Sequence, residues 1–95
     1  MDLLQKKIID QNGIIIRWPK KKEEKLEVLH YIQSKFEKGH DYTEAEVNAI
    51  IMNYHSFGDY ALLRRELYDN YLLNRTADGK KYWVEETDRR TIAST

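Results

Sequence analysis

The sequence predicts a mainly α-helical domain with a small β-sheet, the α+β arrangement of a winged helix-turn-helix with three main helices and a two- or three-stranded sheet. Three observations predict it: a capped amphipathic helix beginning at Thr43, a second helix from about Tyr60 to Asn70, and extended segments on either side of Asp78-Gly79. With 95 residues, 41% of them hydrophobic, the chain can bury one core and therefore form one domain. Folds of this type serve DNA-reading and protein-docking modules alike, so function has to be argued from surfaces.

The two central helices carry their own start signals. Thr43 with Glu46 three residues later forms a capping box. Apolar residues then recur at helical spacing: Val47, Ile50, Ile51 and Tyr54. A glycine-containing turn breaks this helix, and Asp59 offers a carboxylate cap to the next one. The second helix is expected to bury Leu63 and Leu67.

A hairpin follows the second helix. Its strands are predicted over residues 72–75 and 81–84, with one ring of Tyr82-Trp83 pointing inward and the other outward. The β-branched run Ile14–Ile16 predicts a further strand. We expect that strand to join the hairpin's sheet and to end at Pro19, since proline cannot donate to a β-ladder.

A longer helix is predicted between these parts, from about Lys21 to Glu37, with Gly39 as its left-handed cap. Its buried stripe consists of Val28, Leu29, Ile32 and Phe36. Residues 40–42 stand where the short first strand of a winged helix usually lies. Trp18 is expected to cover the sheet edge or the core rim rather than to stack on a ligand.

The chain divides into three parts on this basis. Residues 1–12 form an N-terminal extension whose apolar spacing suits a short helix, residues 13–84 the winged-helix-like domain, and residues 85–95 a polar tail that we expect to be disordered. No apolar run approaches the roughly 20 residues that span a bilayer, and no secretory signal pattern begins the chain. We therefore expect a cytoplasmic protein without a membrane partner.

Charge argues against a simple DNA-binding reading. Sixteen basic and sixteen acidic residues give a pI near 6.8, whereas nucleic-acid-binding domains typically have a pI above about 9. The charge is unevenly placed, because residues 1–40 hold nine Lys and Arg against six Asp and Glu, and residues 41–95 hold seven against ten. A local basic patch can still attract phosphate.

Signals for an enzyme, a metal or a cofactor are absent from the sequence pattern. There is no cysteine, and His30, His40 and His55 lack the close spacing of metal ligands on one element. Ser34 and Ser56 lack the glycine pattern of an exposed nucleophile, and no glycine-rich loop could cradle a phosphate. We expect no enzymatic activity, no cofactor and no metal.

The second helix and its surroundings carry the candidate site. At about 100° per residue, Ala61, Arg65, Tyr68 and Asp69 point away from the buried leucines. Arg65 and Tyr68 are the candidate readers of a DNA major groove, opposed by the carboxylates of Glu66 and Asp69. Arg64 on the flank either joins them or pairs with Glu44 or Glu46, and both readings stay open. The candidate phosphate contacts are Lys20, Lys21, Lys80 and Lys81. An ordinary solvated surface is the more typical explanation for the lysines at 20 and 21, and it is at least as typical for those at 80 and 81.

Three segments resemble a known family: RWPKKKEEKLEVLHYI over residues 17–32, YTEAEVN over 42–48 and LRRELYDNYLLNRTADGKKYW over 63–83. They are similar to an uncharacterised bacterial family, domain of unknown function number two thousand and eighty-seven, from about Gly13 to Val84. The resemblance implies a winged-helix-like module, often C-terminal to helix-turn-helix regulators, and a transcription-related role without an established activity. Tyr71 replaces the family's usual glycine, so the left-handed cap is expected at Asn70. The chain is also expected to lack a separate N-terminal DNA-binding domain.

These observations give two functional hypotheses. The first is a small bacterial transcription regulator that binds double-stranded DNA with Arg65, Tyr68 and Arg64 at the groove. The alternative is a protein-interaction module in which the same helix forms a homodimer or docks on another regulator. Steep salt dependence of binding would favour the first hypothesis, and a salt-insensitive dimer the second.

Overall fold

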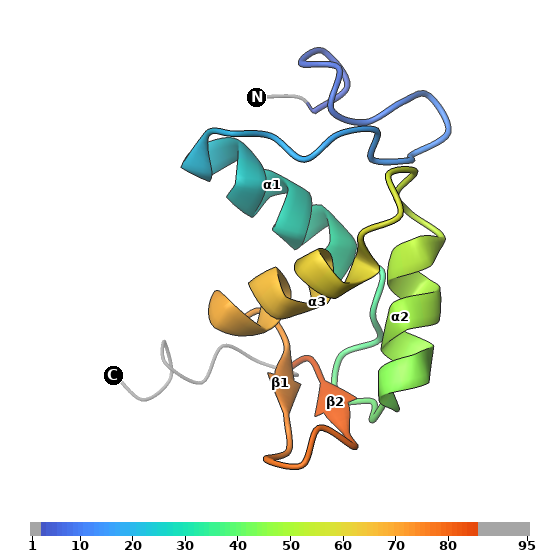
Figure 1. Ribbon diagram of the computed structural model, residues 1–95, viewed down its shortest axis with the longest axis vertical. Helices are drawn as coiled ribbons and strands as arrows, with labels where there is room; N and C mark the ends of the chain where they lie inside the picture. The colour runs from blue at the N-terminus through green and yellow to red at the C-terminus, as the bar shows by residue number, and fades with distance from the viewer. Residues whose placement is uncertain (1–2, 86–95) are drawn as a thin grey trace.

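The computed structural model describes residues 3–85 as three helices followed by an antiparallel hairpin, which confirms the predicted α+β fold (Figure 1). The helices are α1 (Lys22–Gln33), α2 (Glu44–Met52) and α3 (Tyr60–Asp69). The hairpin consists of β1 (Asn74–Arg75) and β2 (Tyr82–Trp83), with Asn74 opposite Trp83. The N-terminal segment lies at one end of the molecule and the hairpin at the other (Figure 1). Of the predicted tail over residues 85–95, all but Glu85 lies outside the described residues.

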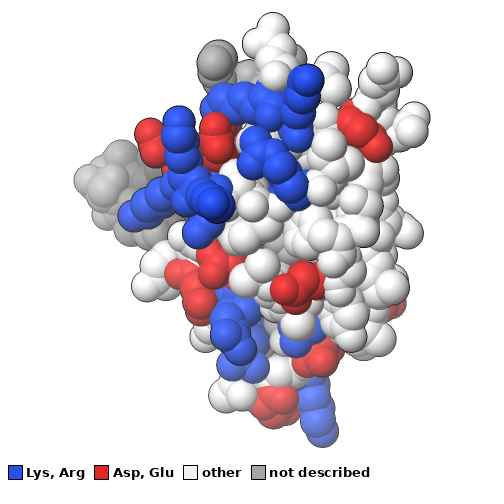
Figure 2. Space-filling model, turned by 45° about the horizontal axis from the view of Figure 1, so that its top comes forward, with Lys and Arg blue, Asp and Glu red and all other residues white. Residues whose placement is uncertain are grey.

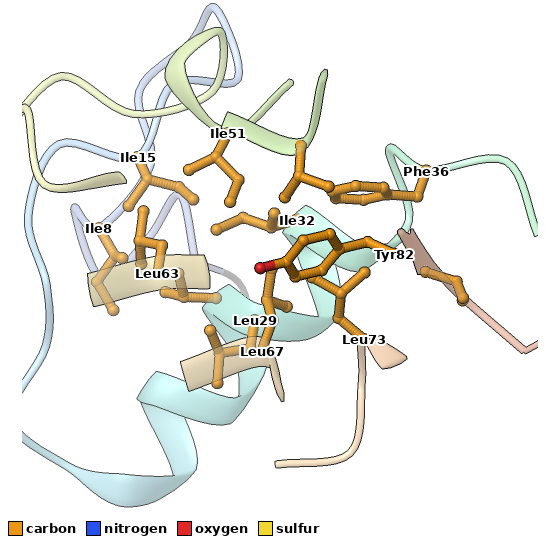
Figure 3. Packing of buried hydrophobic residues seen from close by; sticks show 13 residues of the cluster. Ile8, Ile15, Leu29, Ile32, Phe36, Ile51, Leu63, Leu67, Leu73 and Tyr82 are labelled. Carbon is orange, nitrogen blue, oxygen red and sulfur yellow. The ribbon is translucent and has the colours of Figure 1, made fainter. Parts of the chain in front are cut away.

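One hydrophobic core lies between the three helices and extends to the hairpin (Figure 3). Each predicted stripe residue of α1 is buried, as are Leu63 and Leu67 of α3. Tyr82 is buried and Trp83 is half-buried, so the alternation of the two rings is confirmed. Trp18 packs at the rim of the core, where the Lys25 ammonium lies 5.7 Å from its ring centroid.

Helix α1 is shorter at its C-terminal end than the sequence predicted, since Gln33 is its last residue and Ser34 its cap. A turn carries Phe36 back into the core, which explains why the helical spacing of the stripe extended past the helix. Gly39 has a φ of 75° but does not cap the helix. Its N–H instead donates to the Val84 carbonyl at 2.9 Å and ties this loop to the end of the hairpin.

Helices α2 and α3 begin as predicted. Thr43 Oγ1 accepts from the Glu46 N–H at 3.1 Å, and Glu46 Oε1 accepts from the Thr43 N–H at 2.8 Å. These two bonds are the reciprocal pair of a capping box. Asp59 caps α3 by accepting from the Leu62 N–H at 3.2 Å. Both helix starts are thus fixed by local side chains.

The C-terminal end of α3 differs from the prediction by one residue. The Leu72 N–H donates to the Leu67 carbonyl at 2.9 Å and the Tyr71 N–H to the Tyr68 carbonyl at 3.0 Å, which is the bonding of a Schellman motif. That motif requires the left-handed residue at Tyr71, whose φ is 63°. Asn70 has a φ of −97°, and its side-chain amide donates to the Glu66 carbonyl at 2.8 Å. The expectation of a left-handed Asn70 was wrong.

Residues 3–8 form turns and not the predicted short helix, and Lys7 has a φ of 60°. The segment is nevertheless part of the fold, because Ile8 is fully buried in the core. Lys6 anchors it to α1, with its Nζ 3.2 Å from Glu27 Oε1 and 3.5 Å from Glu24 Oε2. The apolar spacing that suggested a helix therefore reflects a turn that buries one isoleucine.

The run Ile14–Ile16 does not join the hairpin's sheet. Ile15 makes single bridges to Ile9 and His55, and its N–H donates to the Tyr54 carbonyl at 2.7 Å. This run lies with the N-terminal segment at the end of the molecule opposite the hairpin (Figure 1). Just before it, the Tyr31 hydroxyl donates to the Gly13 carbonyl at 2.7 Å.

The edge of β2 is instead taken by Tyr42. Tyr42 and Tyr82 exchange both backbone hydrogen bonds at 2.7 Å in an antiparallel bridge. Residues 40–42 thus occupy the position that the sequence assigned to the first strand of the predicted fold. Within the described part of the chain, no helix is long and apolar enough to cross a membrane.

Candidate nucleic-acid interface

The outer face of α3 carries the two residues predicted as readers. Arg65, Tyr68 and Asp69 are exposed, while Leu63 and Leu67 on the opposite side are fully buried. Within residues 3–85, the Arg65 side chain makes no hydrogen bond or ion pair, and neither Glu66 nor Asp69 neutralises its charge. A free guanidinium can therefore be presented to a ligand from this face.

Tyr68 has a neighbour that the sequence did not reveal. The Arg75 guanidinium of β1 lies 4.9 Å from the centroid of the Tyr68 ring, a cation–π contact. Arg75 reaches this ring because the chain reverses at Tyr71 after α3 ends. The sequence showed only that an arginine follows the second helix in a predicted strand. It did not show which face of the helix this arginine would contact. Arg75 and Arg65 thus place two cations at one side of α3.

Arg64 has a structural partner. Its Nη1 donates to Asn48 Oδ1 of α2 at 2.5 Å, and the side chain is half-buried between the two helices. The structure shows no ion pair to Glu44 or Glu46. The sequence left two roles open for Arg64, a contact with DNA and an ion pair with Glu44 or Glu46. The structure instead shows that Arg64 joins α3 to α2 through the side-chain amide of Asn48.

The two lysines of the hairpin tip differ in charge environment. Lys81 Nζ lies 3.6 Å from Asp41 Oδ2, so part of its charge is compensated. The exposed Lys80 side chain makes no ion pair within the described residues. The turn itself is ordered by Asp78, whose pKa is held below its usual value first by a hydrogen bond from the Thr76 hydroxyl and then by the Lys80 N–H.

Lys20 and Lys21 lie at the start of α1, at the opposite end of the molecule from the hairpin tip (Figure 1). Both are exposed, and Lys21 occupies the N-cap position without a side-chain cap bond. Figure 2 shows Lys and Arg side chains gathered over the upper part of one face, with acidic side chains among them. The predicted phosphate contacts therefore form two separate groups and not one continuous patch.

Histidines do not build a site within the described residues. No group of three or more His, Cys, Asp and Glu side chains there could hold a metal ion. His55 is buried against Phe57, with Nδ1 2.8 Å from the Ile51 carbonyl and Nε2 without a partner. His40 packs on the Tyr42 ring, and its Nδ1 lies 3.7 Å from Glu37. The buried His55 and the exposed His40 thus each have an aromatic neighbour, Phe57 and Tyr42 respectively.

Comparison with known proteins identifies one family, and the description of that family names no activity. The model of a family described as "Uncharacterized protein conserved in bacteria (DUF2087)" matches residues 14–84. No match to a curated protein or to a solved structure was found. The matched range agrees with the extent of the resemblance in the sequence and leaves Lys6 and Ile8 outside it.

Proposed function

Because the chain belongs to this family of uncharacterised bacterial proteins, whose description assigns no activity, we propose from its surface that it is a winged-helix protein that binds nucleic acid through the outer face of α3. The order of its elements supports the proposal: α1, an extended residue paired with the hairpin, α2, α3 and the hairpin. In winged helices and related folds the second helix of the pair enters the major groove. We further propose that the protein regulates transcription in the bacterial cytoplasm.

The observation that carries the proposal is the contrast between two adjacent arginines. Arg64 is held by Asn48 inside the helix pair, whereas Arg65 is exposed and unpaired within the described residues. An exposed charge that stabilises nothing in its own fold is available for a ligand. An arginine in this position can bind guanine through two parallel hydrogen bonds.

Phosphate contacts follow from the positions of the lysines. Lys80 at the hairpin tip and Lys20 and Lys21 at the start of α1 are exposed and carry uncompensated charge within residues 3–85. Lys81 contributes less, because Asp41 competes for it. We expect few phosphate contacts and therefore a salt dependence shallower than that of strongly basic DNA-binding domains.

The test is a fluorescence anisotropy titration of labelled random-sequence duplex at two salt concentrations. Arg65→Ala should weaken binding by about fivefold to 150-fold, because a good arginine–guanine pair contributes about 1–3 kcal/mol. Arg65→Lys keeps the charge but loses the planar fork and should recover only part of the affinity. Lys38→Ala, an exposed cation in the loop after α1, serves as the control and should leave affinity unchanged. Duplex binding that is unaffected by Arg65→Ala would refute the proposal.

A second candidate function is protein docking through the same face, and the exposed tyrosines favour it. The Tyr68 and Tyr71 side chains are 42% and 74% exposed, and tyrosine and arginine are enriched in protein–protein interfaces. In this case the protein would self-associate or bind another regulator. Sedimentation velocity at two salt concentrations separates the cases, since a dimer that persists in high salt without any duplex shift supports docking.

A further inference from the structure

We propose that the N-terminal end of the molecule carries a second nucleic-acid contact, a basic surface that binds the phosphate backbone. We call this surface the basic end, and it consists of five exposed cations: Lys7, Arg17, Lys20, Lys21 and Lys22. The proposal rests on the proposed nucleic-acid function and names the part of the molecule that attracts the phosphates. Lys7, Arg17 and Lys22 are not among the phosphate contacts given above, so they test the basic end separately.

The basic end is the positive part of the described chain. Residues 6–27 hold seven Lys and Arg against four Asp and Glu, whereas residues 28–85 hold seven against nine. In Figure 2, which turns the top of Figure 1 toward the viewer, Lys and Arg side chains gather over the upper part of the visible face. Arg65 and the hairpin belong to the net-negative part. We therefore expect the attraction for the phosphates of a duplex to come from the basic end.

The carboxylates of residues 6–27 neutralise this charge only in part, because three of the four have other partners. The Lys6 ammonium lies 3.2 Å from Glu27 Oε1 and 3.5 Å from Glu24 Oε2. The Asp10 carboxylate accepts from two backbone N–H groups of its own turn, at 2.9 and 3.0 Å. Glu23 is the fourth carboxylate and is exposed. Within residues 3–85, no cation of the basic end forms an ion pair.

Two contacts bring together cations from separate segments. Arg17 Nη2 donates to the Lys6 carbonyl at 3.2 Å, which places the guanidinium next to the backbone of Lys7, the following residue. This neutral carbonyl orients Arg17 without compensating its charge. The Lys6 ammonium then holds the segment against two glutamates of α1. Pro19 is fully buried and fixes the chain that leads to the three lysines at the start of α1. The cations are therefore positioned by the fold before a ligand arrives.

The start of α1 is unfavourable for the helix itself. Lys21 occupies the N-cap, where Ser, Thr, Asp or Asn is preferred, and it makes no side-chain cap bond. The consecutive lysines at 20–22 also place three positive charges at the positive end of the helix dipole, offset in part by two acidic residues of the first turn. The first-turn N–H groups thus lack the side-chain cap that α2 and α3 have. A phosphate bound there would accept from these N–H groups and neutralise the lysines.

The phosphate backbone is the ligand that matches these groups. Lysine ammonium groups bind phosphates as point charges, and such contacts carry no sequence information. Trp18, the aromatic residue next to Arg17, packs on the core and faces the Lys25 ammonium, so its ring is already engaged within the fold. The basic end should therefore hold duplexes of any sequence, while Arg65 on α3 supplies the contact with bases.

The experiment compares Lys22→Glu with Lys38→Glu in the full chain, by anisotropy titration of a labelled random-sequence duplex over a range of salt concentrations. Both variants change the net charge equally, but Lys38 lies in the loop after α1, outside the basic end. Lys22→Glu should weaken binding about tenfold at about 0.1 M salt and lower the slope of log K against log salt by about one. Lys38→Glu should change neither the affinity nor the slope.

Stability separates a lost contact from a damaged fold. Lys22→Glu should raise the urea midpoint of unfolding while it weakens binding, because an acidic residue is favourable at the first position of a helix. Lys21→Asn supplies a preferred N-cap residue and removes one charge, so it should show the same pair of effects. A variant that gains stability and loses affinity has lost a contact with the duplex.

Three results would overturn the proposal. Equal duplex affinity of the wild type, Lys22→Glu and Lys38→Glu would show that the basic end does not contact the duplex. Equal losses for the two variants would show an effect of net charge and not of a local surface. Loss of binding to phosphatidylglycerol vesicles in Lys22→Glu, at unchanged duplex affinity, would identify a lipid surface as the partner. Failure of the proposed function has a different signature, since Arg65→Ala would then leave duplex affinity unchanged while Lys22→Glu weakens it.

Discussion

Replacing Ile8 by alanine tests whether the N-terminal segment is a structural part of the domain. The Ile8 side chain is fully buried, although it lies outside the residues that match the family. The substitution removes three carbon atoms, which are worth about 2–3 kcal/mol of transfer free energy, and partial collapse of the cavity adds to this value. We expect a loss of about 3 kcal/mol in the free energy of unfolding, within the roughly 2–5 kcal/mol found for such core substitutions. In a domain of this size the melting temperature should fall by roughly 12–24 °C.

Urea denaturation followed by circular dichroism measures this loss, provided that the slope with denaturant is unchanged. Ile16→Ala is the matched control, because it makes the same chemical change at a residue that is 42% exposed. Its backbone N–H donates to the Ile8 carbonyl at 2.7 Å, and alanine keeps that bond. The control should lose less than about 1 kcal/mol. Equal losses for the two variants would refute the packing of Ile8 against the helices.

Three further predictions follow from local geometry. Gly13→Ala should destabilise the fold by about 1–3 kcal/mol in urea denaturation, because φ is 81° and the new Cβ would lie 2.8 Å from the Tyr31 hydroxyl; Gly58→Ala, with open space around the Cβ, should lose less. The pKa of Lys6 is raised above 10.5, first by its hydrogen bond to Glu27, so its contribution to stability is present below that pH and lost as pH rises through the folded-state pKa; Lys6→Met should reduce this alkaline loss in melting curves. The pKa of Asp78 is lowered from 3.8, so its contribution to stability is present above that pH and lost as pH falls through the folded-state pKa. Amide hydrogen exchange at the hairpin tip should therefore become faster as the carboxyl group is protonated. Asp78→Asn should remove this pH dependence of exchange.

Local signals predicted the parts of this fold that depend on neighbouring residues. The capping box at Thr43 and the Asp59 cap involve groups within three positions of each other, so their partners are visible in the sequence. The buried and exposed faces of α3 follow from helical geometry alone. That geometry correctly placed Arg65 and Tyr68 on the surface.

Contacts between distant segments were not predictable in the same way. The run Ile14–Ile16 has the composition of a strand, but composition does not identify the strand's partner, and Ile15 pairs with Ile9 and His55 instead of with the hairpin. Arg64 found an amide of α2 where its charge had suggested a carboxylate. Arg75 reached the candidate site through a chain reversal at Tyr71, a residue type that rarely signals one.

The attachment of the hairpin has a consequence for how a partner would bind. Tyr42 pairs with Tyr82 through the backbone, and the Gly39 N–H donates to the Val84 carbonyl. Lys81 forms an ion pair with Asp41. These links fix the root of the hairpin to the residues that lead into α2. A partner that touches the hairpin tip and α3 together would meet a preset angle between them, so association should need little ordering of this part of the chain. Selectivity would then come from the shape of the partner, since only a surface with matching curvature could contact both parts.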